Sequence, residues 1–191
     1  MLTSDDAAVS SAIRFRTAGP EDVSAVVAIV ESAYRGDASR AGWTTEADLL
    51  DGQRTDAEQV RSLLDRQGSV ILLAEAEGNL VGTCHLERSS AERAYFGMFA
   101  VRPGLQGGGI GRALLREAGR LAAACGCSEL RMTVIRQRTE LIAWYGRFGF
   151  APTGETEPFP YGDERFGRPR RDDLEFVVLS GPVRVPEQPA R

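Results

Sequence analysis

The chain has 191 residues, of which 42% are hydrophobic and 26% charged, with a formal net charge of −4 at pH 7. This length suits one domain with a real core, and the acidic balance argues against a nucleic-acid-binding protein, whose phosphate-binding surface is usually basic. No run approaches the roughly 20 apolar residues of a membrane-spanning helix, and the acidic N-terminus lacks the apolar core of a signal peptide. We therefore expect a cytoplasmic protein without nucleic-acid or membrane partners.

The cysteine, histidine and lysine content limits the kinds of binding site that the chain can form. The cysteines are Cys84, Cys125 and Cys127, and the only histidine is His85. The Cys-x-Cys spacing is too tight for the usual zinc pattern, so we expect no metal site and free thiols in a reducing compartment. All 23 basic residues are arginine. A chain without lysine cannot build a phosphate-binding loop that depends on lysine.

The first third of the chain predicts one strand followed by helices. Alternation of apolar and charged residues indicates the strand, and apolar residues at helical spacing indicate the first helix. A Thr-x-x-Glu capping box opens the last helix of this part. The predicted elements are a strand at 12–17, a helix at 20–34, a polar loop at 35–43, a short helix at 45–50 and a helix at 55–66.

The rest of the chain predicts strands interrupted by two helices. Glu77-Gly78-Asn79 between two apolar runs is typical of a hairpin turn, and three glycines at 107–109 lead into an amphipathic helix. The predicted elements are strands at 69–76, 80–88 and 94–101, the helix after 107–109, a strand at 129–135, a helix at 138–148, a strand start at 150–154, a Pro- and Gly-rich loop at 155–170 and a last strand at 173–179.

The resulting order, β-α-α-β-β-β-α-β-α-β-β, predicts an α/β (α+β) protein with one mixed sheet and helices packed on it. The sequence contains no repeat and no internal domain boundary. We expect a single domain at residues 12–180. The segments 1–11 and 181–191 are expected to be disordered ends.

A strand, a turn with three consecutive glycines and a helix N-terminus form an arrangement suited to anions. The first amides of a helix have no partner within the helix, and the helix dipole adds about half a positive charge there. Glycines let a phosphate approach the backbone and allow positive φ. A tight strand–helix connection without a ligand is the simpler alternative. The turn consists of Gln106, Gly107, Gly108, Gly109, Ile110 and Gly111.

Three kinds of anion-binding turn compete for this segment. The P-loop needs a Gly-Lys-Ser/Thr ending, which a lysine-free chain lacks. The Rossmann pattern Gly-x-Gly-x-x-Gly fails, because its third glycine position would be Arg112 or Leu114. That pattern also needs an acidic residue about 20 positions further on, where this chain has Arg131.

The third kind fits. Residues 101–115, VRPGLQGGGIGRALL, closely resemble the pyrophosphate-binding segment of the GNAT superfamily of N-acetyltransferases, whose Gln/Arg-x-x-Gly-x-Gly/Ala signature is met by Gln106, Gly109 and Gly111. The resemblance implies a mainly antiparallel sheet of about six or seven strands with helices on both faces, and acetyl-CoA as cosubstrate. The residues it assigns to the pyrophosphate are Gln106, Gly107, Gly108, Gly109, Ile110, Gly111 and Arg112.

A second segment of the chain extends the resemblance. Residues 143–150, AWYGRFGF, look like the family's aromatic-Tyr-x-x-x-Gly-Phe segment, although an ordinary helix with aromatic core residues would explain most of it. In relatives this hydroxyl reaches the thioester sulfur, which implies Tyr145 as general acid. A thiol pKa of about 8.5 lies below a phenol pKa of about 10, so full proton transfer is uphill. A hydrogen bond that passes the proton as charge develops typically contributes about 10²–10⁴-fold.

The strand before the turn also has a role by this resemblance. In the family it is splayed from its neighbour by a bulge, and the pantetheine arm inserts there and bonds to main-chain groups. The corresponding residues here are Phe99, Ala100 and Val101. Many relatives place Asn seven residues before the Tyr, where it touches the pantetheine. Here that position is Arg138, and the helix start Gln137-Arg138-Thr139 can still cap the helix and bond the cofactor.

The sequence specifies the general base and the acceptor site less closely than the cofactor site. Glu31, His85, Glu87 and Asp173 are candidate bases, and a water chain is an alternative; a lone strand histidine is more often structural. Polar and aromatic loops at 34–44 and 158–167 predict an amine pocket, in which Arg35, Arg40 or Arg165 pairs a carboxylate of the acceptor. The predicted acceptor residues are Tyr34, Arg35, Arg40, Trp43, His85, Glu87, Tyr161 and Arg165.

Together, the motifs predict an acetyl-CoA-dependent N-acetyltransferase that acts on a small-molecule amine by direct attack in a ternary complex. An enzyme for peptide or protein N-termini is the nearest alternative. A non-catalytic acyl-CoA-binding module and a nucleotide- or NAD-binding module are alternatives from other classes. A homodimer also fits, because dimers are common among the relatives.

Overall fold

The computed structural model describes residues 13–184 of the chain. The disordered end predicted at 1–11 and residues 185–191 of the one predicted at 181–191 lie outside these residues. In chain order the elements are β1 (Arg14–Thr17), η1 (Pro20–Asp22), α2 (Val23–Tyr34), α3 (Gly36–Ser39), β2 (Leu50–Asp51), α4 (Ala57–Asp65), β3 (Ser69–Ala76), β4 (Asn79–Arg88), β5 (Arg93–Val101), η2 (Pro103–Leu105), α5 (Ile110–Ala124), β6 (Glu129–Ile135), α6 (Thr139–Gly146), β7 (Ala151–Pro158), η3 (Glu164–Phe166), β8 (Arg168–Pro169) and β9 (Glu175–Pro182).

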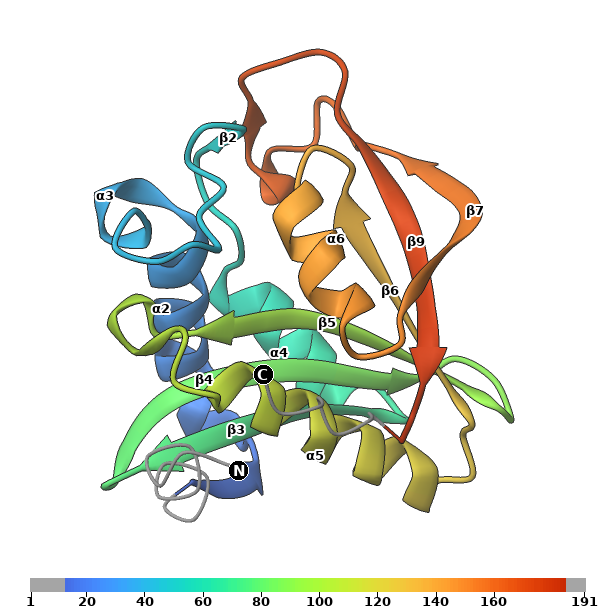
Figure 1. Ribbon diagram of the computed structural model, residues 1–191. Coiled ribbons are helices and arrows are strands. Elements are labelled where there is room, and N and C mark those ends of the chain that lie inside the picture. Colours follow the sequence, from blue (N-terminus) through green and yellow to red (C-terminus); the bar gives the residue numbers. More distant parts are fainter. Residues whose placement is uncertain (1–12, 185–191) are drawn as a thin grey trace.

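Seven strands form one mixed sheet in the order β1-β3-β4-β5-β6-β9-β7 (Figure 1). Every neighbouring pair is antiparallel except β5 and β6, which are parallel. The short strands β2 and β8 form a separate antiparallel pair. The expected mainly antiparallel central sheet is therefore confirmed.

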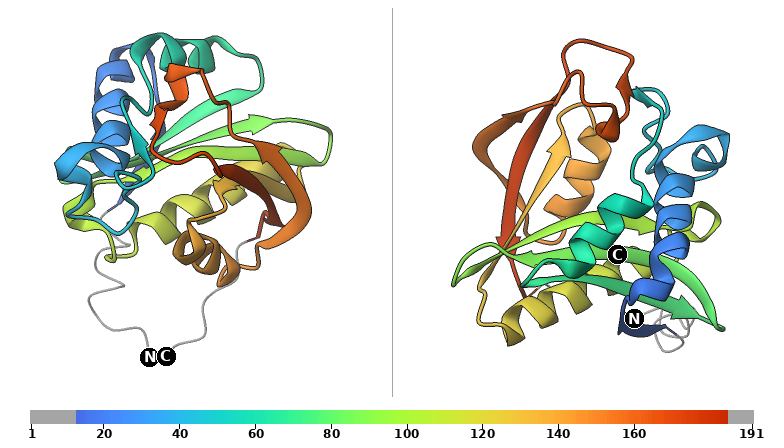
Figure 2. Two further views of the ribbon diagram at one scale, coloured as in Figure 1. Left: turned by 90° about the horizontal axis from the view of Figure 1, so that it is seen from above. Right: turned by 180° about the vertical axis from the view of Figure 1, so that it is seen from behind.

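Helices cover both faces of the sheet, because alternate residues of each strand point to opposite sides. On β3, Leu72 and Ala74 join the core cluster that includes α5 and α6, whereas Ile71 and Leu73 join the cluster that includes α2 and α4. Figure 2 shows α2 and α4 on one side of the sheet and α5 on the other. This confirms the predicted arrangement. None of the helices within residues 13–184 has the length and apolar character needed to cross a bilayer.

The predicted hairpin and the capped helix after residue 55 are confirmed. Between β3 and β4, Glu77 and Gly78 both have positive φ, 51° and 76°, as a tight two-residue hairpin turn requires. The helix α4 begins close to the predicted capping box. Its cap is Asp56 rather than Thr55, and the Asp56 carboxylate accepts a hydrogen bond from the Gln59 amide at 2.8 Å.

The short helix predicted at 45–50 is wrong. The Thr45 hydroxyl accepts a hydrogen bond from the Ala47 amide at 3.2 Å, and the Leu50 amide donates to the Glu46 carbonyl at 2.9 Å. A threonine that bonds its neighbouring backbone competes with a helix. The chain therefore makes a single turn here and then joins β2, which pairs with β8.

Two loop boundaries also differ from the prediction. The expected loop at 35–43 contains the short helix α3, and the expected loop at 155–170 contains the end of β7, η3 and β8. The last strand, β9, continues to Pro182, beyond the predicted domain end at residue 180. Val183 then packs against the main core, and α5 approaches it closely because Gly119 has no side chain. Residues 181–183, which the composition assigns to a disordered tail, are thus part of β9 and of the core beside α5.

Candidate active site

The sheet opens between its two parallel strands. Strands β5 and β6 pair only at residues 93–95 opposite 129–131, although β5 continues to Val101 and β6 to Ile135. Figure 1 shows β6 and β9 rising away from β5, with α6 beside the opening. Main-chain groups along the far half of β5 therefore have no parallel partner strand. This is the splayed strand that the family resemblance implied.

A β-bulge bends β5 at this opening. Two residues of β5, Met98 and Phe99, lie opposite one residue of β4, Cys84, and Met98 has a φ of 44°. Bulges of this kind bend a strand and increase its twist. The Tyr34 hydroxyl donates a hydrogen bond to the Phe99 carbonyl. The end of α2 is therefore attached to the bulge.

The Gly-rich turn follows β5 and leads into α5. Gly107 and Gly109 have φ of 90° and 85°, which glycine adopts without strain. The Ala113 amide donates to the Gly109 carbonyl at 3.0 Å at the start of the helix, so the amides of residues 110–112 precede the helical ladder. These amides and the dipole of a 15-residue helix favour an anion at the turn.

The Gln106 side chain is used inside the protein. Its amide nitrogen donates to the Thr44 hydroxyl at 2.7 Å and to the Val101 carbonyl at 3.0 Å, and its oxygen accepts from the Trp43 amide at 2.9 Å. This close approach needs Gly42, because a Cβ there would lie 2.5 Å from the Gln106 oxygen. The Gln106 side chain thus holds the loop at residues 42–44 against the turn. The main-chain groups of the turn remain available to a ligand.

A cavity of about 500 Å³ begins at the turn; we call it the turn cavity. Its lining includes Arg112 and the glycines at one end and aromatic rings elsewhere. The Phe99 and Trp144 rings stack with centroids 5.8 Å apart, and Trp43 lies 6.2 Å from Trp144. Gly111 keeps the space open, since a Cβ there would lie 3.1 Å from the Phe99 ring. The combination suits a phosphate group that carries a long arm.

A second cavity, of about 620 Å³, lies among α2, α4, β4, β5, β6 and the segment around η3; we call it the inner cavity. Among the described residues, Phe99 alone lines both cavities. The two spaces therefore adjoin at the bulge of β5, where both contact Phe99.

Tyr145 lines the inner cavity from α6 and is only 4% exposed. Its ring centroid lies 6.2 Å from that of Phe99. Within residues 13–184 its hydroxyl has no hydrogen-bond partner, and burial raises the pKa of Tyr145 well above its ordinary value. Nearby Tyr34 adds to this shift in pKa. The hydroxyl is therefore protonated at neutral pH and available to donate.

Two of the four candidate bases lie on the wall of the inner cavity. His85 and Glu87 line it; the His85 ring is bonded to the Ser69 hydroxyl at 2.8 Å, and burial lowers the pKa of His85 below 6.5. The other two lie elsewhere. The Glu31 carboxylate accepts the amides of residues 54 and 55, and Asp173 pairs with an arginine at the surface.

The predicted acceptor residues are divided between the two cavities. Tyr34, Arg35 and Arg165 line the inner cavity, whereas Trp43 lines the turn cavity. The Arg165 guanidinium is exposed and forms a fork with Asp163, with N–O distances of 2.5 and 2.8 Å. The loop at 34–44 therefore contributes to both spaces.

Two predicted acceptor residues line neither cavity. Arg40 pairs with Asp48 at 2.9 Å at the surface. Tyr161 is 45% exposed, and its hydroxyl donates to the Arg171 carbonyl and accepts from the Leu174 amide at 2.7 Å. These side chains stabilise the loops themselves, which the composition of the loops alone does not reveal.

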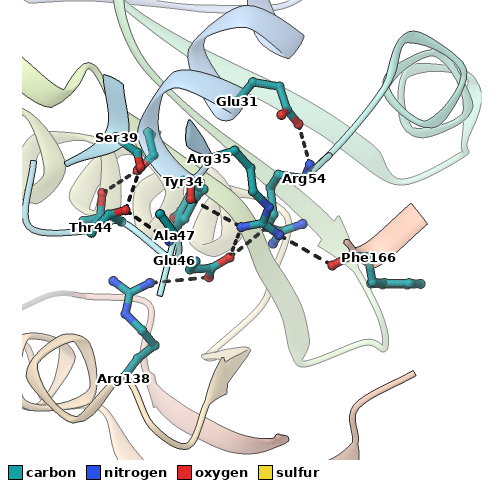
Figure 3. A network of polar contacts seen from close by, with 12 residues as sticks. Glu31, Tyr34, Arg35, Ser39, Thr44, Glu46, Ala47, Arg54, Arg138 and Phe166 are labelled. Carbon is teal, nitrogen blue, oxygen red and sulfur yellow. Dashed lines mark hydrogen bonds and ion pairs between the residues drawn. The ribbon is translucent and has the colours of Figure 1, made fainter. Parts of the chain in front are cut away.

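A buried charge cluster that the sequence did not single out lies beside the inner cavity (Figure 3). We call it the Glu46 cluster: Glu46 pairs with Arg35 at 2.6 Å, Arg138 at 3.4 Å and Arg54 at 3.9 Å. Arg138, assigned to the cofactor by resemblance, lines neither cavity and faces Glu46. No local pattern marks the cluster, because Arg138 lies 92 positions from Glu46 in the sequence. One carboxylate among three guanidiniums leaves an excess of positive charge.

The cysteines lie away from both cavities. Cys84 and Cys127 are buried, Cys125 is exposed, and all three thiols are free. In the part of the chain that the structure describes, no group of three or more His, Cys, Asp or Glu side chains is placed to hold a metal ion.

The splayed sheet and the Gly-rich turn before a helix are the features that the resemblance to N-acetyltransferases implied. A sequence profile of the acetyltransferase (GNAT) family matches residues 29–150, more than half of the chain, and the chain belongs to this family. A search of curated proteins finds no match.

Solved structures share the fold over nearly the whole chain. The ribosomal-protein-alanine N-acetyltransferase from Brucella melitensis is 22% identical, with 88% of this chain and 99% of that one covered and a TM-score of 0.65. Nourseothricin acetyltransferase is 22% identical, with 90% and 99% covered and a TM-score of 0.63. An acetyltransferase from Elizabethkingia anophelis with acetyl-CoA bound is 18% identical, with 90% and 98% covered and a TM-score of 0.61. At these identities the similarity establishes the fold.

Proposed function

We propose that this chain transfers an acetyl group from acetyl-CoA to the amine of a small molecule, with Tyr145 as general acid. The observation that carries the proposal is that both cavities contact Phe99, whose ring lies 6.2 Å from that of Tyr145, a residue whose hydroxyl has no hydrogen-bond partner within residues 13–184. Membership of the acetyltransferase family and the acetyl-CoA-bound similar structure support acetyl-CoA as the donor.

The turn cavity is the proposed place of the donor. The amides of the turn and of the first residues of α5 would hold the diphosphate together with Arg112. Each hydrogen bond to a charged oxygen contributes about 1.5–3 kcal/mol. The pantetheine arm would then follow the open edge of β5 through Phe99, Ala100 and Val101 and bring the thioester to the bulge.

The proposed reaction is a direct attack in a ternary complex. The amine nitrogen bonds to the thioester carbonyl carbon, and the carbon–sulfur bond breaks to release the CoA thiolate. The Tyr145 hydroxyl, which is protonated at neutral pH, donates a hydrogen bond to the sulfur as charge develops there. The amine proton leaves toward His85 and Glu87, directly or through water.

The closed wall of the inner cavity supports a small acceptor. Pairing of β2 with β8 joins residues 50–51 to 168–169, and the Arg35 guanidinium donates to the Phe166 carbonyl at 3.5 Å. The two loops predicted to build the acceptor site are thus joined to each other. A polypeptide acceptor would need an open groove at this position.

Replacing Tyr145 with Phe tests the proposal, because it removes the hydroxyl and keeps the ring. The expected kcat for thiol release from acetyl-CoA falls about 10²–10⁴-fold, while the Kd of acetyl-CoA, measured by calorimetry, is unchanged. Unchanged kcat would remove Tyr145 from the reaction. Absence of acetyl-CoA binding to the unmodified protein would remove the proposed function itself.

A further inference from the structure

Arg54 lines the inner cavity, and Figure 3 shows it beside Arg35 and Glu46. Its side chain is 32% exposed, its one ion pair is the 3.9 Å contact with Glu46, and it makes no side-chain hydrogen bond within residues 13–184. It lies over the Tyr34 ring, with 5.6 Å from the guanidinium carbon to the ring centroid. The Glu31 carboxylate accepts the Arg54 amide at 2.5 Å and so holds the main chain in place. The guanidinium is therefore positioned and still has donors to offer.

The charge around Arg54 favours an anion. The Arg35 and Arg138 side chains are only 5% and 10% exposed, and both share the single carboxylate of Glu46 with Arg54. The Arg35 Nε atom is buried and has no hydrogen-bond partner among the described residues. Burying unbalanced charge is costly. A negative group on the open side of Arg54 would offset the excess positive charge.

Arg54 lies close to the point where the cavities meet. The Tyr34 ring beneath its guanidinium carries the hydroxyl that bonds the Phe99 carbonyl at the bulge. The Phe99 ring in turn lies 6.2 Å from the Tyr145 ring. Arg54 is thus linked to the bulge through a single side chain, that of Tyr34.

The other arginines proposed from sequence are already engaged. Arg35 is committed to Glu46 at 2.6 Å, Arg40 lies outside both cavities, and Arg165 forks onto Asp163. Arg54 has donors left and faces the inner cavity.

Acidic side chains also line the inner cavity, and two of them already have partners. Asp56 caps α4, and Glu87 pairs with Arg66 at 3.0 Å. Glu58 and Glu157 also line the cavity, and they would attract the ammonium end of the same acceptor.

We propose that the acceptor is an amine that also carries a carboxylate, of the size of an amino acid, and that Arg54 binds this carboxylate. The inference rests on the acetyl transfer proposed above and names its substrate class. Charge-assisted, forked hydrogen bonds between arginine and carboxylate are among the strongest that side chains make.

Matched acceptor pairs test this inference. Thiol release from acetyl-CoA is measured with a panel of amino acids and their carboxamides. The carboxamide amine is the less basic of each pair, so at neutral pH a larger fraction of it is unprotonated, and the protonation state of the amine does not favour the acid. The expected kcat/KM favours the acids about 10-fold or more, and Arg54→Gln lowers it about 10–100-fold for the acids only.

Arg61→Gln is the matched control, because Arg61 is exposed on α4 and does not line the inner cavity. Arg61→Gln is expected to leave kcat/KM unchanged for both the acids and the carboxamides. Equal kcat/KM for acids and carboxamides, or equal losses for both on Arg54→Gln, would overturn the inference and leave the acetyl transfer standing.

Binding of the same panel to CoA-saturated protein, measured by calorimetry, gives a readout without turnover. The acids are expected to bind more tightly than their carboxamides, and Arg54→Gln is expected to abolish the difference. No difference in the unmodified protein would also overturn the inference. Failure of the protein to bind acetyl-CoA or CoA would count against the proposed function instead.

Discussion

Tyr145 and His85 are buried titratable side chains on the wall of the inner cavity. Burial disfavours the charged form of each, so it raises the pKa of Tyr145 and lowers the pKa of His85. Both are therefore neutral at pH 7. In this state Tyr145 can donate a proton and His85 can accept one, as the proposed reaction requires.

His85 makes the stability of the protein depend on pH in a narrow window. The unfolded side chain titrates near 6.5, and the folded one at a lower value because it is buried. Between these values the unfolded state binds more protons, so the free energy of unfolding falls as the pH drops below 6.5. Replacing His85 with Gln, which can still bond Ser69, should flatten this slope in urea unfolding between about pH 7.5 and 5.

The sequence supplies the control for this measurement. His85 is the only histidine, and the pKa of carboxyl groups such as Asp22 and Glu129 is lowered, so these groups affect stability at lower pH. If the His85→Gln variant keeps the full dependence of unfolding free energy on pH, His85 is not the source of that dependence.

Among the elements, the Gly-rich turn and α5 act as one unit. Gly109 has a φ of 85° and is the N-cap of α5, so its conformation sets the direction of the first helical amides. Replacing Gly109 with Ala should cost about 1–2 kcal/mol of stability. Because the amides would shift, the Kd of acetyl-CoA should rise about 10-fold or more by calorimetry.

Gly104 provides a matched control two residues before Gln106. A Cβ at Gly104 would meet nothing within 4 Å, and its φ is not in the positive range. Gly104→Ala should therefore change neither unfolding nor acetyl-CoA affinity. Equal effects of the two variants would mean that the positive φ of Gly109 is not what matters.

Across the whole molecule, the Glu46 cluster joins parts of the chain that the sheet separates. It connects Arg35 after α2 and Arg54 before α4 to Arg138 at the start of α6. Replacing Glu46 with Gln would leave three guanidiniums without a carboxylate. The expected loss in the free energy of unfolding, measured with urea, is about 3–5 kcal/mol, as for other broken buried pairs.

The exposed pair of Arg40 and Asp48 is the comparison for this prediction. Both side chains are at least 48% exposed, so Asp48→Asn should cost less than about 1 kcal/mol. A similarly small loss for Glu46→Gln would show that the cluster is balanced by water rather than by Glu46.

Features that depend on neighbouring residues could be predicted from the sequence. The Glu77-Gly78-Asn79 turn, the glycines before α5 and the periodic helices are set by local backbone preferences and side-chain spacing. The order of these elements, with the family motifs, was enough to predict the mixed sheet. It was also enough to select Tyr145 and the turn as candidates.

Features that depend on residues distant in the sequence could be identified only in the folded structure. The turn at 45–50 leads into β2, which pairs with the distant strand β8, and Arg138 pairs with Glu46 across 92 positions. Arg54 stood out only after folding placed it over Tyr34. Local propensity acts between residues that are neighbours in the chain, so it can be predicted from the sequence. Burial, ion pairing and cavity shape depend on which distant segments come together, so only the tertiary structure determines them.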